Sequence, residues 1–200
     1  MKTMELPAMA VKRLKFKALA TDNDECVNVL KKRFNQTAPD LVWASDITYI
    51  RAGGKFYHLC VVIDLFSRKI ISYKISAHPD AQLAKDAFLA AYNKRKPKSL
   101  MFHSDRGSQY TAFSFRTLLD NCSVVQSFSK RGHPYDNAVV ESFFKFLKTE
   151  ETNRRNYQTL KELELSIFKY IEGYYNSKRP HSSLGYLTPN EAEANFYSQT

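Results

Sequence analysis

Cysteine is scarce in this chain, and the few cysteines stand apart. Cys26, Cys60 and Cys122 are odd in number, widely separated and without a CxxC pair. This excludes a disulfide framework and a thiolate zinc site as organising features. We expect a protein of a reducing compartment, in keeping with a cytoplasmic location.

Long apolar runs are absent as well. The longest strongly apolar stretch, residues 59–63, is far shorter than the ~20 residues of a membrane-spanning helix. The residues after Lys2 also lack the apolar segment of a secretory signal. The sequence thus predicts a soluble, intracellular protein with no membrane partner.

Acidic residues are too few to balance the basic ones. Twenty Asp and Glu stand against thirty Lys and Arg, which gives a net charge of +10 and a pI near 9.4. This balance favours a polyanionic partner, either nucleic acid or an acidic membrane surface. Because many basic proteins bind neither, charge alone leaves the partner open.

Hydrophobic residues are plentiful enough for one main domain, at 44% of 200 residues. Their periodicity predicts strands at residues 41–50, 56–64, 69–76, 99–105 and 124–129, and helices at 80–92, 111–121, 138–148 and 160–175. Three successive strands indicate an antiparallel meander, and the later alternation indicates an α/β protein with helices covering the sheet. We divide the chain into a basic N-terminal arm or linker (1–40), a core (41–176) and a C-terminal strap (177–200).

Two aspartates occupy strand positions from which a carboxylate could take part in catalysis. Asp105 ends an apolar strand just before Arg106 and Gly107 turn the chain, where a carboxylate can reach a ligand. The alternative is an ordinary turn or helix-capping aspartate. Asp46 lies inside the first strand on the face of Ala44 and Thr48, where an acid needs a partner because burying an unpaired charge is unfavourable.

Glu141 lies on the polar face of a predicted helix. The spacing of 3.6 residues per turn groups it with Asn137, Lys145 and Lys148. An amphipathic helix with a solvated Glu–Lys face would look the same. Together with the two aspartates, however, Glu141 could hold two divalent ions, and Mg²⁺ prefers such oxygen ligands.

The sequence motifs around these acids resemble those of a known family. Asp46 in WASDITYI, Asp105 in HSDRGSQYT and Glu141 in YDNAVVESFFKFLK are similar to the DDE triad of the transposase and retroviral-integrase superfamily, with 141 − 105 − 1 = 35 residues between the last two acids. The motifs VVIDLFSRKIISYKIS, SFSKRGHPYDNA and YNSKRPHSSLGYLTP also read like bacterial transposases of the insertion-sequence-three type. The resemblance runs from residue 34 to residue 189.

This resemblance implies a fold, a reaction and partners. The fold would be ribonuclease-H-like, with a mixed sheet of three antiparallel strands and then two parallel ones, flanked by helices. Asp46, Asp105 and Glu141 would bind Mg²⁺, or Mn²⁺ as a substitute, for cutting DNA and joining its 3′-hydroxyl to another phosphodiester. Partners would be element ends and target duplex, bound by a homo-oligomer associated with the bacterial nucleoid.

We expect DNA contacts near the triad, from Lys145, Lys148, Asn137, Arg106, Lys130 and Arg131. Two other functions stay open: a structure-selective nuclease of the same fold, and a catalytically silent DNA-binding derivative. Asp64 is a rival metal ligand by position, although a turn role or pairing with Arg68 is favoured. His103 is expected to be a packed or hydrogen-bonded histidine, and Arg179 belongs to the strap, which could either dock on the core or contact DNA.

Overall fold

The computed structural model describes residues 26–130 and 137–199. Its strands are β1 (Val42–Ala52), β2 (Lys55–Asp64), β3 (Ile70–Ser76), β4 (Met101–Ser104) and β5 (Val125–Phe128). Its helices are α1 (Ala81–Arg95), α2 (Ser108–Thr111), α3 (Phe113–Asn121), α4 (Ala138–Glu150), α5 (Leu160–Tyr170) and α6 (Pro189–Ser198), with short turns η2 (Thr152–Arg154), η3 (Ile171–Tyr175) and η4 (Ser182–Leu184). Within these residues no helix is both long and apolar enough to cross a bilayer.

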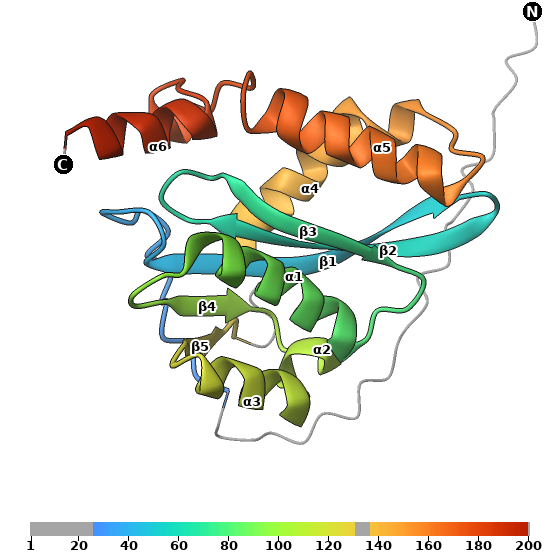
Figure 1. Ribbon diagram of the computed structural model, residues 1–200. Coiled ribbons are helices and arrows are strands. Elements are labelled where there is room, and N and C mark those ends of the chain that lie inside the picture. The colour runs from blue at the N-terminus through green and yellow to red at the C-terminus, as the bar shows by residue number, and fades with distance from the viewer. Residues whose placement is uncertain (1–25, 131–136, 200) are drawn as a thin grey trace, which may run out of the picture.

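The five strands form one mixed sheet in the order β3-β2-β1-β4-β5 (Figure 1). Strands β1, β2 and β3 pair antiparallel, whereas β4 and β5 add in parallel, which confirms the predicted sheet. Gly53 and Gly54 both have positive φ and join β1 to β2 in a two-residue turn. Glycine suits this hairpin because both central residues adopt the left-handed region.

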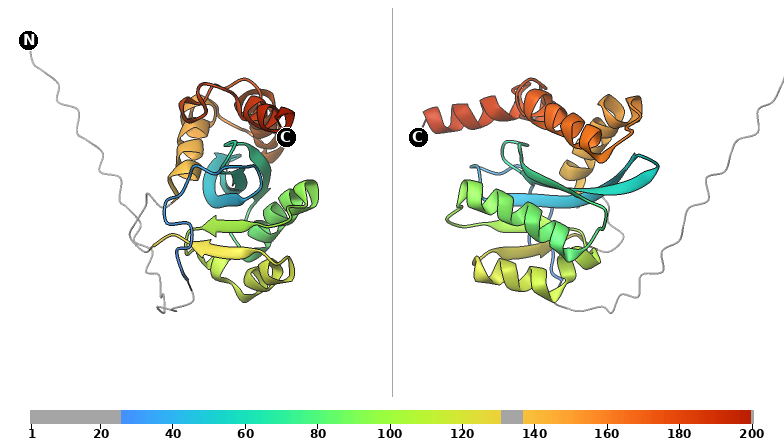
Figure 2. Two further views of the ribbon diagram at one scale, coloured as in Figure 1. Left: turned by 90° about the vertical axis from the view of Figure 1, so that its left-hand side faces the viewer. Right: turned by 45° about the vertical axis from the view of Figure 1, so that its right-hand side comes forward.

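Helices cover both faces of the sheet, and each face has its own core (Figure 2). On one face α4, α5 and η3 pack against the sheet through Val140, Phe143, Leu147 and Ile167. On the other face α1, α2 and α3 enclose the second core. Its buried residues include the predicted stripe of the first helix: Leu83, Ala84, Ala87, Phe88 and Ala91.

The described part of the N-terminal arm packs on the core. Leu30 is buried with the α4-side core, and the backbone amides of Val29 and Leu30 donate to Ser127 Oγ at 3.0 Å each. The amide of Phe128 in β5 donates to Val27 O at 2.9 Å. Residues 26–30 therefore extend the domain beyond the expected start at residue 41.

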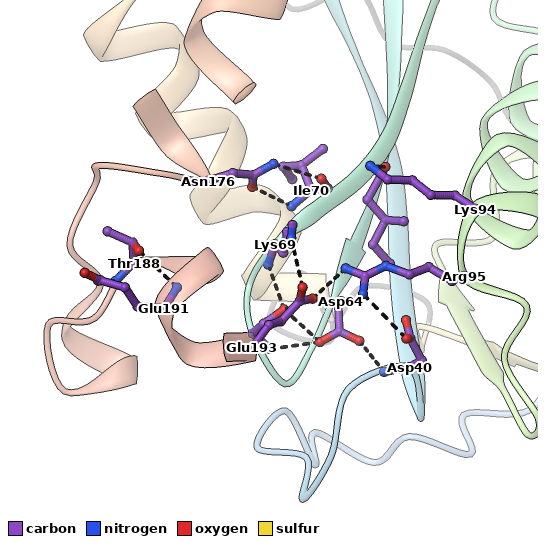
Figure 3. A network of polar contacts seen from close by, with 12 residues as sticks. Asp40, Asp64, Lys69, Ile70, Lys94, Arg95, Asn176, Thr188, Glu191 and Glu193 are labelled. Carbon is purple, nitrogen blue, oxygen red and sulfur yellow. Dashed lines mark hydrogen bonds and ion pairs between the residues drawn. The ribbon is translucent and has the colours of Figure 1, made fainter. Parts of the chain in front are cut away.

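The C-terminal strap docks as a helix that the apolar pattern did not predict. Helix α6 begins with a capping box in which Thr188 and Glu191 satisfy each other's backbone amides. Its Glu193 is buried, accepts a hydrogen bond from Ser67 and forms ion pairs with Lys69 at 2.9 Å and Arg95 at 2.6 Å (Figure 3). This cluster fastens α6 to the β2–β3 turn and to the end of α1.

Two predicted helices differ in detail from those observed. The helix expected at 111–121 is divided at Ala112, which has extended ψ, into α2 and α3. The helix expected at 160–175 is α-helical only to Tyr170 and continues as the wider turn η3. Asn176 then closes that segment by bonding both backbone groups of Ile70 at 3.0 Å.

Candidate active site

Asp46 and Asp105 are brought together by the parallel pairing of β1 and β4. Ala44 pairs with His103 in this ladder. Continuing the register by two residues places Asp46 level with Asp105, which directly follows β4. Neighbouring strands lie ~4.8 Å apart and alternate residues share a face, so both carboxylates lie on the α4 side at the end of β4.

Asp46 is largely withdrawn from water and keeps one local hydrogen bond. Its Oδ1 accepts from the amide of Ile47 at 2.7 Å. Burial, and next the negative charge of Asp105, raise the pKa of Asp46 to about 7, with a smaller contribution from Glu141. The Lys148 ammonium opposes this shift but does not cancel it. The site therefore holds more negative charge than its own cations balance.

Asp105 is exposed at the mouth of the same site. Its Oδ1 accepts from the amide of Gly107 at 3.0 Å. A Cβ on Gly107 would stand 3.0 Å from that oxygen, so glycine lets the backbone approach the carboxylate. Loss of hydration raises the pKa of Asp105, and the Gly107 hydrogen bond opposes the rise.

Glu141 reaches the site from the first turn of α4. The helix is positioned by Asn137, whose side-chain amide donates to Ser45 O, beside Asp46, at 3.1 Å. Val140 and Phe143 bury the opposite face of the helix in the core, which leaves Glu141 exposed. Partial desolvation raises the pKa of Glu141. The structure thus groups the three predicted acids at one end of β4.

The donor set suits a hard divalent cation. All three groups are carboxylates, and Asp46 has a raised pKa because of burial and neighbouring negative charge, both of which a bound cation would counter. Among residues 26–130 and 137–199, however, no three His, Cys, Asp or Glu side chains, these three acids included, lie closely enough together to hold a metal ion. An ion bound by carboxylates at this position would take its remaining ligands from water and substrate phosphate oxygens.

Two lysines extend from Glu141 along α4. Lys145 is exposed, whereas Lys148 is half-buried with its Nζ 5.2 Å from the centre of the Tyr49 ring. Desolvation lowers the pKa of Lys148, and the attraction of Asp46 acts against this. Sequence reasoning missed Tyr49, although its outward position in the first strand could have indicated it.

The other predicted DNA contacts have different surroundings. Asn137 is buried and holds α4 to β1, and Arg106 donates to Ser129 O at 3.1 Å and Cys26 O at 3.0 Å. Both side chains therefore have structural partners. Lys130 is exposed at the end of the segment that follows β5, and Arg131 lies outside the described residues.

The rival residues have structural roles. Asp64 is fully buried, and its carboxylate accepts hydrogen bonds from Asp40, Phe66 and Ser67, which confirms a turn role; Arg68 instead donates to backbone carbonyls, Leu65 O among them. His103 is buried with ring nitrogens 2.9 and 3.2 Å from two serine hydroxyls, as expected. Arg179 docks on α4 through an ion pair with Glu150 at 2.8 Å.

Comparison with known sequences identifies the family of the chain. Residues 36–134 match one integrase core domain family and residues 123–189 match a second of the same description. The chain is 43% identical over 167 residues to the transposase for insertion sequence element IS904 of Lactococcus lactis subsp. lactis (strain IL1403), covering 83% of this chain and 66% of that protein. It is 38% identical to transposase InsF for insertion sequence IS3A of Escherichia coli (strain K12), covering 83% of this chain and 58% of that protein.

Solved structures share the fold at low sequence identity. The HTLV-2 integrase catalytic core domain in complex with magnesium aligns with a TM-score of 0.64 at 17% identity, covering 80% of this chain and 99% of that one. A chain of the simian T-cell lymphotropic virus intasome aligns with a TM-score of 0.66 at 18% identity, over 80% of this chain and 56% of that one. The chain spans about two thirds or less of the transposases it matches. This chain belongs to the integrase core domain family, and the relatives that it resembles in sequence are insertion sequence transposases.

Proposed function

We propose that this chain is the catalytic core of a DNA transposase. It would hydrolyse a phosphodiester at an element end and join the freed 3′-hydroxyl to a target duplex. The observation that carries the proposal is the placement of Asp46, Asp105 and Glu141 on one side of the sheet at the end of β4. Membership of the integrase core family and the transposase relatives support it.

The three acids would hold the divalent ions of the reaction. Mg²⁺, or Mn²⁺ in its place, would activate the attacking oxygen and stabilise the leaving oxygen when bound. The HTLV-2 integrase core, which shares this fold, was solved in complex with magnesium, and this supports the choice of ion. The chain itself orients the ligands: the Ile47 amide fixes Asp46, the Gly107 amide fixes Asp105, and Asn137 sets the helix that carries Glu141.

The lysines of α4 would bind the DNA backbone. Lys145 and Lys148 lie on the helix that carries Glu141, one and two turns further along. Phosphates drawn to these cations would lie close to the carboxylates, which favours attack at a neighbouring phosphodiester.

We also propose that the protein acts as a homo-oligomer on DNA in the bacterial cytoplasm, near the nucleoid. The trimeric and dimeric forms of the HTLV-2 integrase core support such assembly.

Incubation of the chain with labelled element ends and Mg²⁺ tests the proposal, with cleaved and joined strands separated on a denaturing gel. Asp46→Asn, Asp105→Asn and Glu141→Gln should each abolish both products while leaving folding and DNA affinity largely intact. Asp120→Asn and Glu164→Gln, which change exposed acids on α3 and α5, are matched controls and should retain activity.

The products of this reaction also distinguish a transposase from the two alternative functions. Cleavage without joining would indicate a nuclease of the same fold. DNA binding with neither product, at any Mg²⁺ or Mn²⁺ concentration, would indicate a silent derivative. Normal joining by any one of the three variants would remove that residue from the site.

A further inference from the structure

Two aromatic side chains are exposed together on the β1–β2 hairpin. Tyr49 is 60% exposed and Phe56 is 58% exposed. The register pairs Tyr49 with His58 and Arg51 with Phe56, so the two aromatic rings are diagonal neighbours on one face of the hairpin. Their centroids are 5.6 Å apart and their planes nearly perpendicular. Together they form a ring surface, hereafter the aromatic platform, that faces solvent.

The aromatic platform lies on the opposite face of β1 from Asp46, and Lys148 of α4 links the two. Tyr49 follows Asp46 by three residues in β1 and therefore points to the opposite face of the strand. At this point β1 has run past the end of β4, since the two strands pair only along Val42–Ala44. Lys148 connects the two features: its ammonium stands 5.2 Å from the centre of the Tyr49 ring and is attracted by Asp46. Lys148 therefore lies between the carboxylate of Asp46 on one face of β1 and the ring of Tyr49 on the other.

The charge around the aromatic platform fits a nucleic acid strand. Arg51 and Lys55 are exposed on the same hairpin, and residues 47–58 contain no Asp or Glu. An aromatic face flanked by cations is the combination that binds single-stranded nucleic acid, because bases stack on the rings while cations attract phosphates. A surface meant for a second copy of this basic chain would bring like charges together.

We propose that Tyr49 and Phe56 stack an unpaired base of the DNA strand whose phosphate lies at Asp46 and Asp105. Lys148 binds the phosphate between that base and the acids. This proposal rests on the proposed function and adds to it a preference for DNA that is frayed or single-stranded beside the reacting phosphodiester. The ligand at the aromatic platform is the base itself, of any sequence, since every base presents a face for stacking.

The test measures binding of the full chain in EDTA, so that chemistry does not intervene. One probe is a duplex with a three-nucleotide single-stranded extension containing 2-aminopurine, and the other is the same duplex with blunt ends. Tyr49→Ala and Phe56→Ala should each weaken binding of the extended duplex about tenfold, given the usual contribution of one stacked base. They should leave blunt-duplex affinity within about twofold, and they should abolish the quenching of 2-aminopurine that the wild type produces.

Tyr197→Ala is the matched control. Tyr197 on α6 is 56% exposed and also meets a phenylalanine edge-to-face at 5.6 Å, but its charged neighbours are Asp40, Arg95 and Glu193. The Tyr197→Ala variant should bind both DNA probes with the affinity of the wild type. Tyr49→Phe should retain stacking, and comparison of Tyr49→Leu with Tyr49→Phe replaces the alanine variant if that variant does not fold.

Two results would overturn the proposal. One is that Tyr49→Ala weakens binding of both probes equally, or changes the affinity for neither probe. The other is a loss of self-association, measured by sedimentation, without any change in 2-aminopurine quenching, which would make the aromatic platform an interface between copies. Failure of the proposed function would appear separately, as absent cleavage by the wild-type chain with Mg²⁺ even where stacking is observed.

Discussion

At the scale of single residues, Lys145 and Lys148 are the cations best placed to bind DNA beside the acids. Removing one phosphate contact should reduce the slope of log affinity against log salt by about 0.9. Replacing both lysines by Ala should therefore flatten that slope by about two units, as measured by fluorescence anisotropy from low to moderate salt. The double variant Lys161→Ala, Lys169→Ala on α5 changes the net charge equally and should leave the slope nearly unaltered. An unchanged slope in the Lys145 and Lys148 variant would contradict the proposed role of these lysines.

His181 gives a second prediction, which concerns stability against pH. Burial, then the charges of Arg179 and Arg68, lower the pKa of His181 to about 4, against the opposing charge of Glu150. Its Nε2 is buried without a hydrogen-bond partner among the described residues. Because the unfolded chain takes up this proton near pH 6.5, the folded state should lose up to about 3 kcal/mol from this group as pH falls from 6.5 to 4, with none lost above that range.

The measurement compares urea unfolding of the wild type and His181→Phe across pH 4 to 8. Phenylalanine retains a ring against Tyr175, which the histidine ring meets at 4.8 Å, but does not titrate. The difference in unfolding free energy between the two proteins should shift in favour of the variant below pH 6.5. His78→Phe, at an exposed histidine, should show no such shift.

Single residues also show where sequence patterns mislead. Helical spacing placed Asn137 beside Glu141 and the lysines as a DNA-facing group. In the structure Asn137 instead occupies the N-cap position of α4, where its side chain makes no capping hydrogen bond and turns inward to Ser45 O. Spacing describes the interior of a helix well, but the residue before the first turn has non-helical backbone angles and points elsewhere.

At the scale of elements, α6 is held by one buried acid. Glu193 accepts a hydrogen bond from Ser67 and pairs with Lys69 and Arg95 (Figure 3). Burial would raise the pKa of Glu193, but Lys69 and Arg95 lower it overall. Removing one member of a buried ion pair leaves uncompensated charge, so Glu193→Ala should lower the free energy of unfolding by about 3 kcal/mol or more. Thr188→Ala, which removes only the cap of α6, should cost about 1 kcal/mol. Equal effects of the two changes in urea titrations would argue against this cluster as the main attachment.

The sequence predicted elements according to how regular their apolar pattern was. The five strands and the stripe of α1 followed directly from apolar runs and 3.6-residue spacing, and their bounds were nearly correct. Helix α6 escaped because its docking residue is a glutamate, and a glutamate is usually assigned to the surface unless its distant cations are known. The three acids of the candidate site were proposed from the family motifs, while the level placement of Asp46 and Asp105 required the β1–β4 register.

At the scale of the whole molecule, the described basic groups near the acids are suited to phosphates rather than base edges. Lys145 and Lys148 project from a helix packed on the sheet, and the contacts expected of them carry no sequence information. Specific recognition needs side chains that read the grooves. No complete helix-turn-helix pattern is recognisable in the sequence of residues 1–40.

We therefore expect this 200-residue chain to bind element ends and unrelated duplex with affinities within about tenfold, or about 1.4 kcal/mol, at matched salt. Competition of both DNAs against a labelled element end measures the ratio. A thousandfold preference for the end would mean that residues 1–40, or the strap around Arg179, contact base edges.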